Sequence, residues 1–160
     1  MPLFFRKPPY ISSNVNFPLS LVAMITRSQL VEELVEYFFR HRFTVNGAKG
    51  LAGYKQPPSI RNDGFGDLRE RIPDVIGMDT EQHRIVFGVI RTERRTLDAE
   101  ESLTDYNVFL DHRHGAGPEA SLLVVLLPPS LITEFTHILT HYIHREYRHR
   151  VVGVSSTLMT

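Results

Sequence analysis

Apolar residues recur at helical spacing in the first third of the chain. Leu30, Leu34 and Phe38 fall on one face of a helix, and Val31 and Val35 lie beside them. An apolar stripe of this width is typical of a helix that packs against a core. The sequence therefore predicts an amphipathic helix with one buried face.

Polar residues indicate where this helix begins. Thr26 or Ser28 can cap its first turn, because a side-chain oxygen there accepts a hydrogen bond from a backbone amide that has no partner within the helix. We expect the helix to run from about residue 28 to residue 41. A short strand at Phe43–Val45 is expected to follow it.

Four further segments have the composition of buried strands. Residues 72–77 and 85–92 are short and apolar, and a polar turn at residues 78–84 joins them. Residues 120–127 are apolar without interruption, which is typical of a strand covered on both faces. Residues 151–154 add a final strand.

Two more helices complete the predicted pattern. Thr96 can cap a helix that runs to about Leu110, and Ser130 can cap a helix that runs to about Tyr147. The resulting order is helix, three strands, helix, strand, helix, strand. This order predicts the α/β class, with helices flanking a sheet.

One predicted connection is unusually long. It spans residues 46–72, whereas connections in compact domains have a median of ~4–6 residues. The sequence leaves two interpretations open: a flap that faces a substrate, or a surface excursion that carries a short hairpin.

The composition is that of an ordinary globular domain, with 42% hydrophobic and 22% charged residues. The formal net charge is zero, so composition gives no support to a nucleic-acid binder, which more often has a basic excess. The absence of cysteine excludes disulfides and thiolate metal sites, and it fits a cytoplasmic protein. No apolar segment approaches the ~20 residues of a membrane span, so no membrane partner is expected.

Residues 1–23 differ from the rest of the chain because they contain four prolines and show no helical period. Met24 stands directly before the first predicted helix. One interpretation is that Met24 is the true start and that the preceding residues extend the gene model. The other is that they form a docking arm or an added edge strand. We expect residues 24–160 to form one α/β domain.

The candidate chemistry lies in the two central strands. The first contains Pro73 and Asp74, and the second contains Val89 and ends near Arg91. This arrangement resembles the metal-binding core of the PD-(D/E)xK nuclease superfamily. That family has a carboxylate at the position of Val89 and usually a lysine at the position of Arg91.

The resemblance extends over roughly residues 28–154. The first helix followed by His41–Val45 is similar to the opening of archaeal-type Holliday-junction resolvases. In that family a glutamate of the first helix can join the metal site, and Glu32 and Glu33 lie near the expected place. The resemblance implies a restriction-endonuclease-like fold, in which helices flank a mixed sheet.

The chemistry of the family requires magnesium, which carboxylates, waters and phosphate oxygens hold beside the scissile phosphate. The resemblance implies that Asp74 is a metal ligand. Valine cannot bind a metal, and arginine stays protonated, although it can bind a phosphate through two hydrogen bonds. Val89 and Arg91 would face the Asp74 site, because alternate residues of a strand share a face. Glu93 shares that parity and could replace the missing carboxylate, so the catalytic candidates are Asp74, Arg91 and Glu93.

Basic residues near these strands are candidates for contacts with DNA. Lys49 and Arg61 lie in the long connection, and Arg94 and Arg95 follow the second strand. If the family's chemistry is retained, we expect a metal-dependent phosphodiesterase that uses magnesium. If it is not, no cofactor is implied.

Three histidines form a second candidate site on the last predicted helix. His137, His141 and His144 lie on one face, opposite an apolar stripe. Two histidines at this spacing can hold zinc, but the glutamate of the HExxH pattern is absent. The remaining interpretations are a solvated helix face, or a pH-dependent basic face that binds phosphate or a partner and also includes Arg145, Arg148, His149 and Arg150.

Three functional hypotheses follow from the sequence. The first is a catalytically weakened or inactive nuclease-like domain, a pseudoenzyme that serves as a binding or assembly module. The second is an active magnesium-dependent DNA endonuclease whose second carboxylate has migrated. The third is an unrelated α/β scaffold. The partners that these hypotheses allow are DNA, another protein, or a second copy of the chain in a homodimer.

Overall fold

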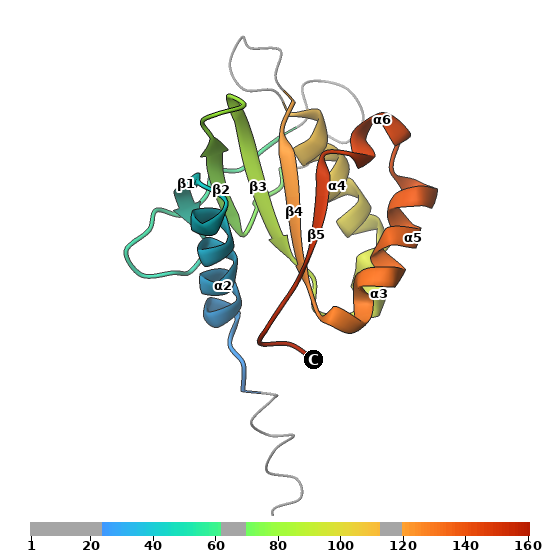
Figure 1. Ribbon diagram of the computed structural model, residues 1–160, viewed down its shortest axis with the longest axis horizontal. Coiled ribbons are helices and arrows are strands. Elements are labelled where there is room, and N and C mark those ends of the chain that lie inside the picture. The colour runs from blue at the N-terminus through green and yellow to red at the C-terminus, as the bar shows by residue number, and fades with distance from the viewer. Residues whose placement is uncertain (1–23, 62–69, 113–119) are drawn as a thin grey trace, which may run out of the picture.

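A single five-stranded sheet organises the computed structural model, which describes residues 24–61, 70–112 and 120–160 (Figure 1). Neighbouring strands follow their order in the sequence from β1 to β5. Strand β2 runs antiparallel to β1 and β3, whereas β4 and β5 run parallel to β3. The predicted α/β class with a mixed sheet and flanking helices is therefore confirmed. The strands are β1 (Phe43–Ala48), β2 (Val75–Asp79), β3 (Arg84–Ile90), β4 (Leu122–Leu127) and β5 (Val151–Ser155).

Helix α2 (Arg27–Arg40) covers one face of the sheet, as the first apolar stripe predicts. Thr26 is its N-cap: the hydroxyl of Thr26 accepts a hydrogen bond from the Gln29 amide, and the Gln29 side chain accepts one from the Thr26 amide. This reciprocal pair satisfies two amides that would otherwise lack partners. The buried face packs on β1, β2 and β3 and consists of Leu30, Val31, Leu34, Val35 and Phe38.

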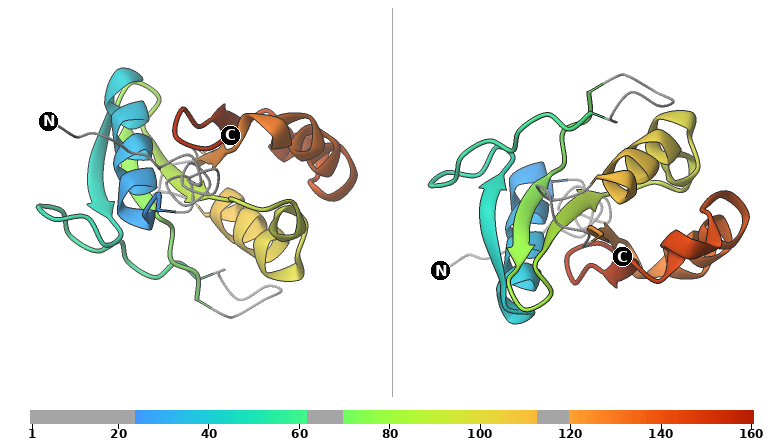
Figure 2. Two further views of the ribbon diagram at one scale, coloured as in Figure 1. Left: turned by 90° about the horizontal axis from the view of Figure 1, so that it is seen from below. Right: turned by 90° about the horizontal axis from the view of Figure 1, so that it is seen from above.

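The opposite face of the sheet is covered by α4 (Glu100–Asp111) and α5 (Ile132–Tyr142). Figure 2 shows α2 on one side of the sheet and these two helices on the other. Tyr106 of α4 meets Phe135 of α5 edge to face, with ring centroids 5.9 Å apart. Each face of the sheet thus has its own hydrophobic cluster.

The second predicted helix is interrupted, and the prediction that Thr96 caps it is wrong. Thr96 lies inside the short helix α3 (Arg94–Leu97), and its hydroxyl donates to the Glu93 carbonyl. The buried hydroxyl of Tyr106 donates to the Leu97 carbonyl. The Leu97 carbonyl is therefore hydrogen-bonded to a side chain, and the Leu97 side chain is fully buried in the core. The helix ends at this point, and α4 begins three residues later.

The last predicted helix is also divided, and Ser130 does not cap it. Ser130 lies in a 3-10 turn, α5 ends at Tyr142, and a separate short helix, α6 (Arg145–Arg148), follows. The break occurs at Ile143, which has extended backbone and a side chain 1% exposed in the core.

The strand boundaries differ slightly from the prediction. Strand β1 continues to Ala48 and contains a bulge between Val45 and Gly47. Strand β2 includes Met78 and Asp79, which the sequence places in the turn. In the described parts of the long connection, residues 49–61 and 70–74, an isolated antiparallel bridge joins Ile60 and Arg71.

Candidate functional site

Asp74 lies immediately before β2 and is almost fully buried, with 4% of its surface exposed. Its two carboxylate oxygens accept hydrogen bonds from Nη2 of Arg27, at 3.0 and 3.1 Å. Oδ2 also accepts a hydrogen bond from the backbone amide of Ile90, at 2.9 Å. A guanidinium and a backbone amide therefore hold the carboxylate in one position.

Backbone bonds place Asp74 at the junction of three strands. Its amide donates to the Gly88 carbonyl of β3, and its carbonyl accepts from the amide of Lys49, which follows β1. The antiparallel register pairs Val75 with Gly88, so the residue before β2 lies beside the last residues of β3. This register explains why the Asp74 carboxylate meets the Ile90 amide.

Arg27, which the sequence does not single out, is the side-chain partner of Asp74. It occupies the first turn of α2, where the positive end of the helix dipole disfavours a cation. Its side chain is 54% exposed, whereas that of Asp74 is 6% exposed. A cation at the start of a helix is unfavourable unless an anion lies nearby. The position of Arg27 in the first turn of α2 was therefore a sequence feature that favours a carboxylate partner.

The two predicted neighbours of Asp74 on β3 serve other purposes. Val89 is 2% exposed and belongs to the hydrophobic cluster that packs under α4 and α5. The guanidinium of Arg91 turns to α4, where Nε donates to the Ser102 hydroxyl at 2.8 Å and Nη2 donates to Asp105 at 2.7 Å. The structure therefore brings Asp74 next to the end of β3 but gives Arg91 a different carboxylate.

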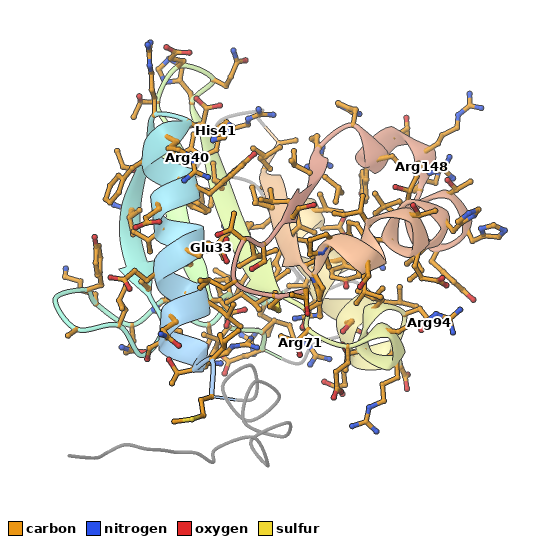
Figure 3. The ribbon with its side chains drawn as sticks, turned by 60° about the horizontal axis from the view of Figure 1, so that its bottom comes forward. Glu33, Arg40, His41, Arg71, Arg94 and Arg148 are labelled. Carbon is orange, nitrogen blue, oxygen red and sulfur yellow. The ribbon has the colours of Figure 1, made fainter. Side chains whose placement is uncertain are left out.

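Asp105 also attracts a second arginine. Arg71 Nε lies 3.4 Å from Asp105 Oδ1, and Arg71 Nη1 lies 2.5 Å from Glu101 Oε2. The side chains of Arg71 and Arg91 are only 10% and 12% exposed. Figure 3 shows Arg71 between α2 and the segment that contains α3 and α4. We call Arg71, Arg91, Glu101 and Asp105 the α4 arginine cluster.

Burial dominates the electrostatics of the α4 arginine cluster. It raises the pKa of the Asp105 carboxyl above its ordinary value, while Arg91 and Arg71 act in the opposite direction. Burial likewise raises the pKa of Tyr106, over whose ring the Arg91 guanidinium lies at 5.4 Å. These groups join the end of β3 to α4 and to the segment that precedes Asp74.

Glu93 is the carboxylate that the sequence offers as a replacement ligand. It precedes α3, its side chain is 54% exposed, and its Oε1 accepts a hydrogen bond from Arg95 at 3.0 Å. It also lines a pocket of about 560 Å³ at the start of α2. The other lining residues are Ile25, Leu30, Thr92, Pro128, Met159 and Thr160.

The four candidate DNA contacts are all exposed but do not share one environment. Arg94 pairs with Glu134 at 3.0 Å, and this carboxylate raises the pKa of Arg94. Arg95 pairs with Glu93. Lys49 and Arg61 lie in the long connection, and only the backbone of Lys49 contacts Asp74.

The other candidate metal ligands are dispersed. Glu33 accepts hydrogen bonds from Ser156 and Thr157 and so ties α2 to the segment after β5. His137, His141 and His144 are exposed, as predicted. Within the described parts of the chain, no three His, Asp or Glu side chains are grouped so that they could hold a metal ion.

Among the described helices, none has the length and apolar character needed to cross a membrane. Comparison with models of protein families, with curated proteins and with solved structures finds no match to the chain.

Proposed function

We propose that this chain is a nuclease-like domain that does not cleave nucleic acid and instead acts as a binding or assembly module. The order of its elements and the position of Asp74 support the likeness to PD-(D/E)xK nucleases. The contacts of Asp74 support the loss of cleavage. Both parts of the proposal therefore depend on the end of the sheet where β2 begins and β3 ends.

The observation that carries the proposal is the pairing of Asp74 with Arg27. A nuclease of this type needs the Asp74 carboxylate to hold a divalent cation beside the phosphate. Here the Arg27 guanidinium contacts both carboxylate oxygens. A permanent cation from the protein thus takes the place that a metal ion would need.

The contacts of β3 agree with this proposal. Val89 contributes to the core instead of a carboxylate. The Arg91 guanidinium donates hydrogen bonds to Ser102 and Asp105 of α4, so it helps to hold α4 on the sheet. Neither residue supplies a second metal ligand or a base beside Asp74.

The active-nuclease hypothesis retains one specific observation in its favour. Glu93 follows β3 by three residues, and its side chain is exposed. The exposed Arg27 side chain could release Asp74 if substrate phosphate attracted it. Under that hypothesis, Asp74 and Glu93 would hold magnesium only when DNA is bound.

A cleavage assay separates these two functions. Wild type, Asp74→Ala and Arg27→Ala are incubated with single-stranded, duplex and branched DNA in the presence of magnesium or manganese. We expect no metal-dependent cleavage by any of the three. Cleavage by the wild type that Asp74→Ala abolishes would overturn the proposal and establish a nuclease. Electrophoretic mobility of the same DNA substrates then tests whether DNA is the partner, and sedimentation tests whether the module is a homodimer.

A further inference from the structure

A groove of about 490 Å³ lies where α4 meets the junction of α5 and α6, away from Asp74. Its walls come from the end of α5, from α6 and from one residue of α4. We call this the α5–α6 groove. It is lined by Asn107, His141, Tyr142, Ile143, His144, Arg145 and Arg148.

The charge of the α5–α6 groove is one-sided. Two arginines and two histidines line it, and no carboxylate does. Six described arginines outside the groove have a carboxylate partner, whereas neither Arg145 nor Arg148 has one among the described residues. The arginines with a carboxylate partner within 4.0 Å are Arg27, Arg71, Arg84, Arg91, Arg94 and Arg95.

Arg148 is held in place without being neutralised. Its Nε donates to the Ile143 carbonyl at 2.9 Å, and its Nη2 donates to the Thr140 carbonyl at 2.7 Å. These carbonyls belong to the end of α5, so they fix the guanidinium but leave its positive charge unpaired by any described carboxylate. Figure 3 shows Arg148 on α6, well separated from Arg71 and Arg94. A fixed guanidinium loses less freedom when it binds an anion.

Of the two nearby acids, one contacts a residue outside the groove and the other contacts only His144 of the groove, not its arginines. Asp111 accepts a hydrogen bond from the Tyr147 hydroxyl. Oε2 of Glu146 lies 3.5 Å from Nδ1 of His144. The same nitrogen accepts a hydrogen bond from the backbone amide of Glu146. Because Nδ1 is an acceptor, the proton of neutral His144 is on Nε2, which makes this nitrogen a donor. The groove therefore offers donors from Arg145, Arg148 and His144.

We propose that the α5–α6 groove binds a phosphate group. A phosphate presents several oxygens to converging donors, and arginine binds such groups in planar, paired geometry. The phosphate is either that of a small phosphorylated molecule or one of the backbone phosphates of a nucleic acid. This site is independent of Asp74, so it stands whether or not the chain cleaves DNA.

Titrations followed by amide NMR test the proposal with two probes, pyrophosphate and a short single-stranded DNA. Arg145→Ala removes an exposed charge. At Arg148 the substitution is to lysine, which keeps the charge, because the Arg148 side chain also donates hydrogen bonds to carbonyls at the end of α5. Arg40→Ala is the matched control, because it removes an exposed arginine at the end of α2, away from the groove. We expect saturable shifts confined to residues 141–148 and Asn107. Arg145→Ala should weaken binding about tenfold, as expected for the loss of one charge-assisted hydrogen bond, and Arg40→Ala should not change it.

The two probes distinguish the two sources of phosphate. Saturation by pyrophosphate identifies a site for a small phosphorylated ligand. Saturation by DNA alone identifies a backbone site, and Arg145→Ala should then reduce the salt slope by about 0.7, the value for one phosphate contact on a single strand. No saturable shift at residues 141–148 with either probe at millimolar concentration, or an equal loss in Arg40→Ala, would overturn the proposal.

Discussion

Asp74 and Asp105 both bind arginine near the end of β3, but the two sites differ in burial. At Asp74 one arginine approaches from α2, and its side chain is 54% exposed. At Asp105 two arginines approach from the sheet side, and both are nearly buried. The arginine is thus exposed at the first site and enclosed at the second, whereas the carboxylate is 6% exposed at Asp74 and 23% exposed at Asp105.

This difference assigns different tasks to the two sites. An exposed ion pair contributes about 0–1 kcal/mol, because water screens it and the side chains lose freedom. In a buried pair, removal of one partner leaves a charge without compensation, which costs about 3–5 kcal/mol. The α4 arginine cluster is therefore a structural joint. Loss of the exposed Arg27 guanidinium should cost less, because water can take its place beside Asp74 and the Ile90 amide still donates to the carboxylate.

The largest expected effect is that of Arg91→Ala. It leaves Asp105 without its closest cation and removes the guanidinium over the Tyr106 ring. We expect urea unfolding to show a loss of about 3 kcal/mol, the low end for a broken buried pair because Arg71 remains. A loss no greater than that of Arg27→Ala would contradict the assignment of a structural joint.

Asp74→Ala should have an intermediate effect. The Ile90 amide loses the acceptor that lies at 2.9 Å, and an unpaired buried amide costs about 1–3 kcal/mol. Asp74→Asn keeps a side-chain oxygen and should recover most of this loss. Equal unfolding free energies for the two variants would mean that the Ile90 contact contributes nothing to stability.

The pH dependence of stability should report on Asp105. Because burial raises its pKa in the folded state, the folded protein binds more protons than the unfolded chain above the ordinary value of about 3.9. Asp105 therefore makes stability fall as pH rises from that value through the raised pKa. Asp105→Asn should lack this fall, which urea titrations at several pH values can measure. An unchanged slope in the variant would assign the effect to another group.

Arg27→Ala should have the smallest effect on stability. The pair is exposed on the arginine side, and the alanine relieves the unfavourable cation at the start of α2. We expect a smaller loss in urea unfolding than that of Arg91→Ala, because water can replace the exposed guanidinium while the Ile90 amide continues to hold Asp74. A loss as large as that of Arg91→Ala would erase the distinction between the two sites.

Much of the fold could be predicted because local patterns determine it. The first helix, its Thr26 cap and its buried stripe follow from spacing along the chain. The break between α3 and α4 could not be predicted, because it depends on a hydrogen bond from Tyr106 to Leu97 that forms only in the packed state. The break at Ile143 has a similar origin, since core burial overrides the helical period there.

The candidate site was less predictable than the fold. The position of Asp74 beside the end of β3 follows from two adjacent antiparallel strands. Its partner Arg27 lies 47 residues away along the chain, and no short pattern connects the two. Arg91 was expected to face Asp74, but α4 supplies Ser102 and Asp105, and the long guanidinium turns to them.

The most direct test of the central claim is paramagnetic NMR with manganese. Bound manganese broadens the signals of nearby amides, and the Ile90 amide reports on Asp74 because it donates to this carboxylate. If Arg27 occupies the place of the metal, the Ile90 signal of the wild type should remain sharp as manganese is added. Selective broadening of Ile90 at low manganese concentration, abolished by Asp74→Ala, would contradict the account and show that Asp74 holds a metal despite Arg27.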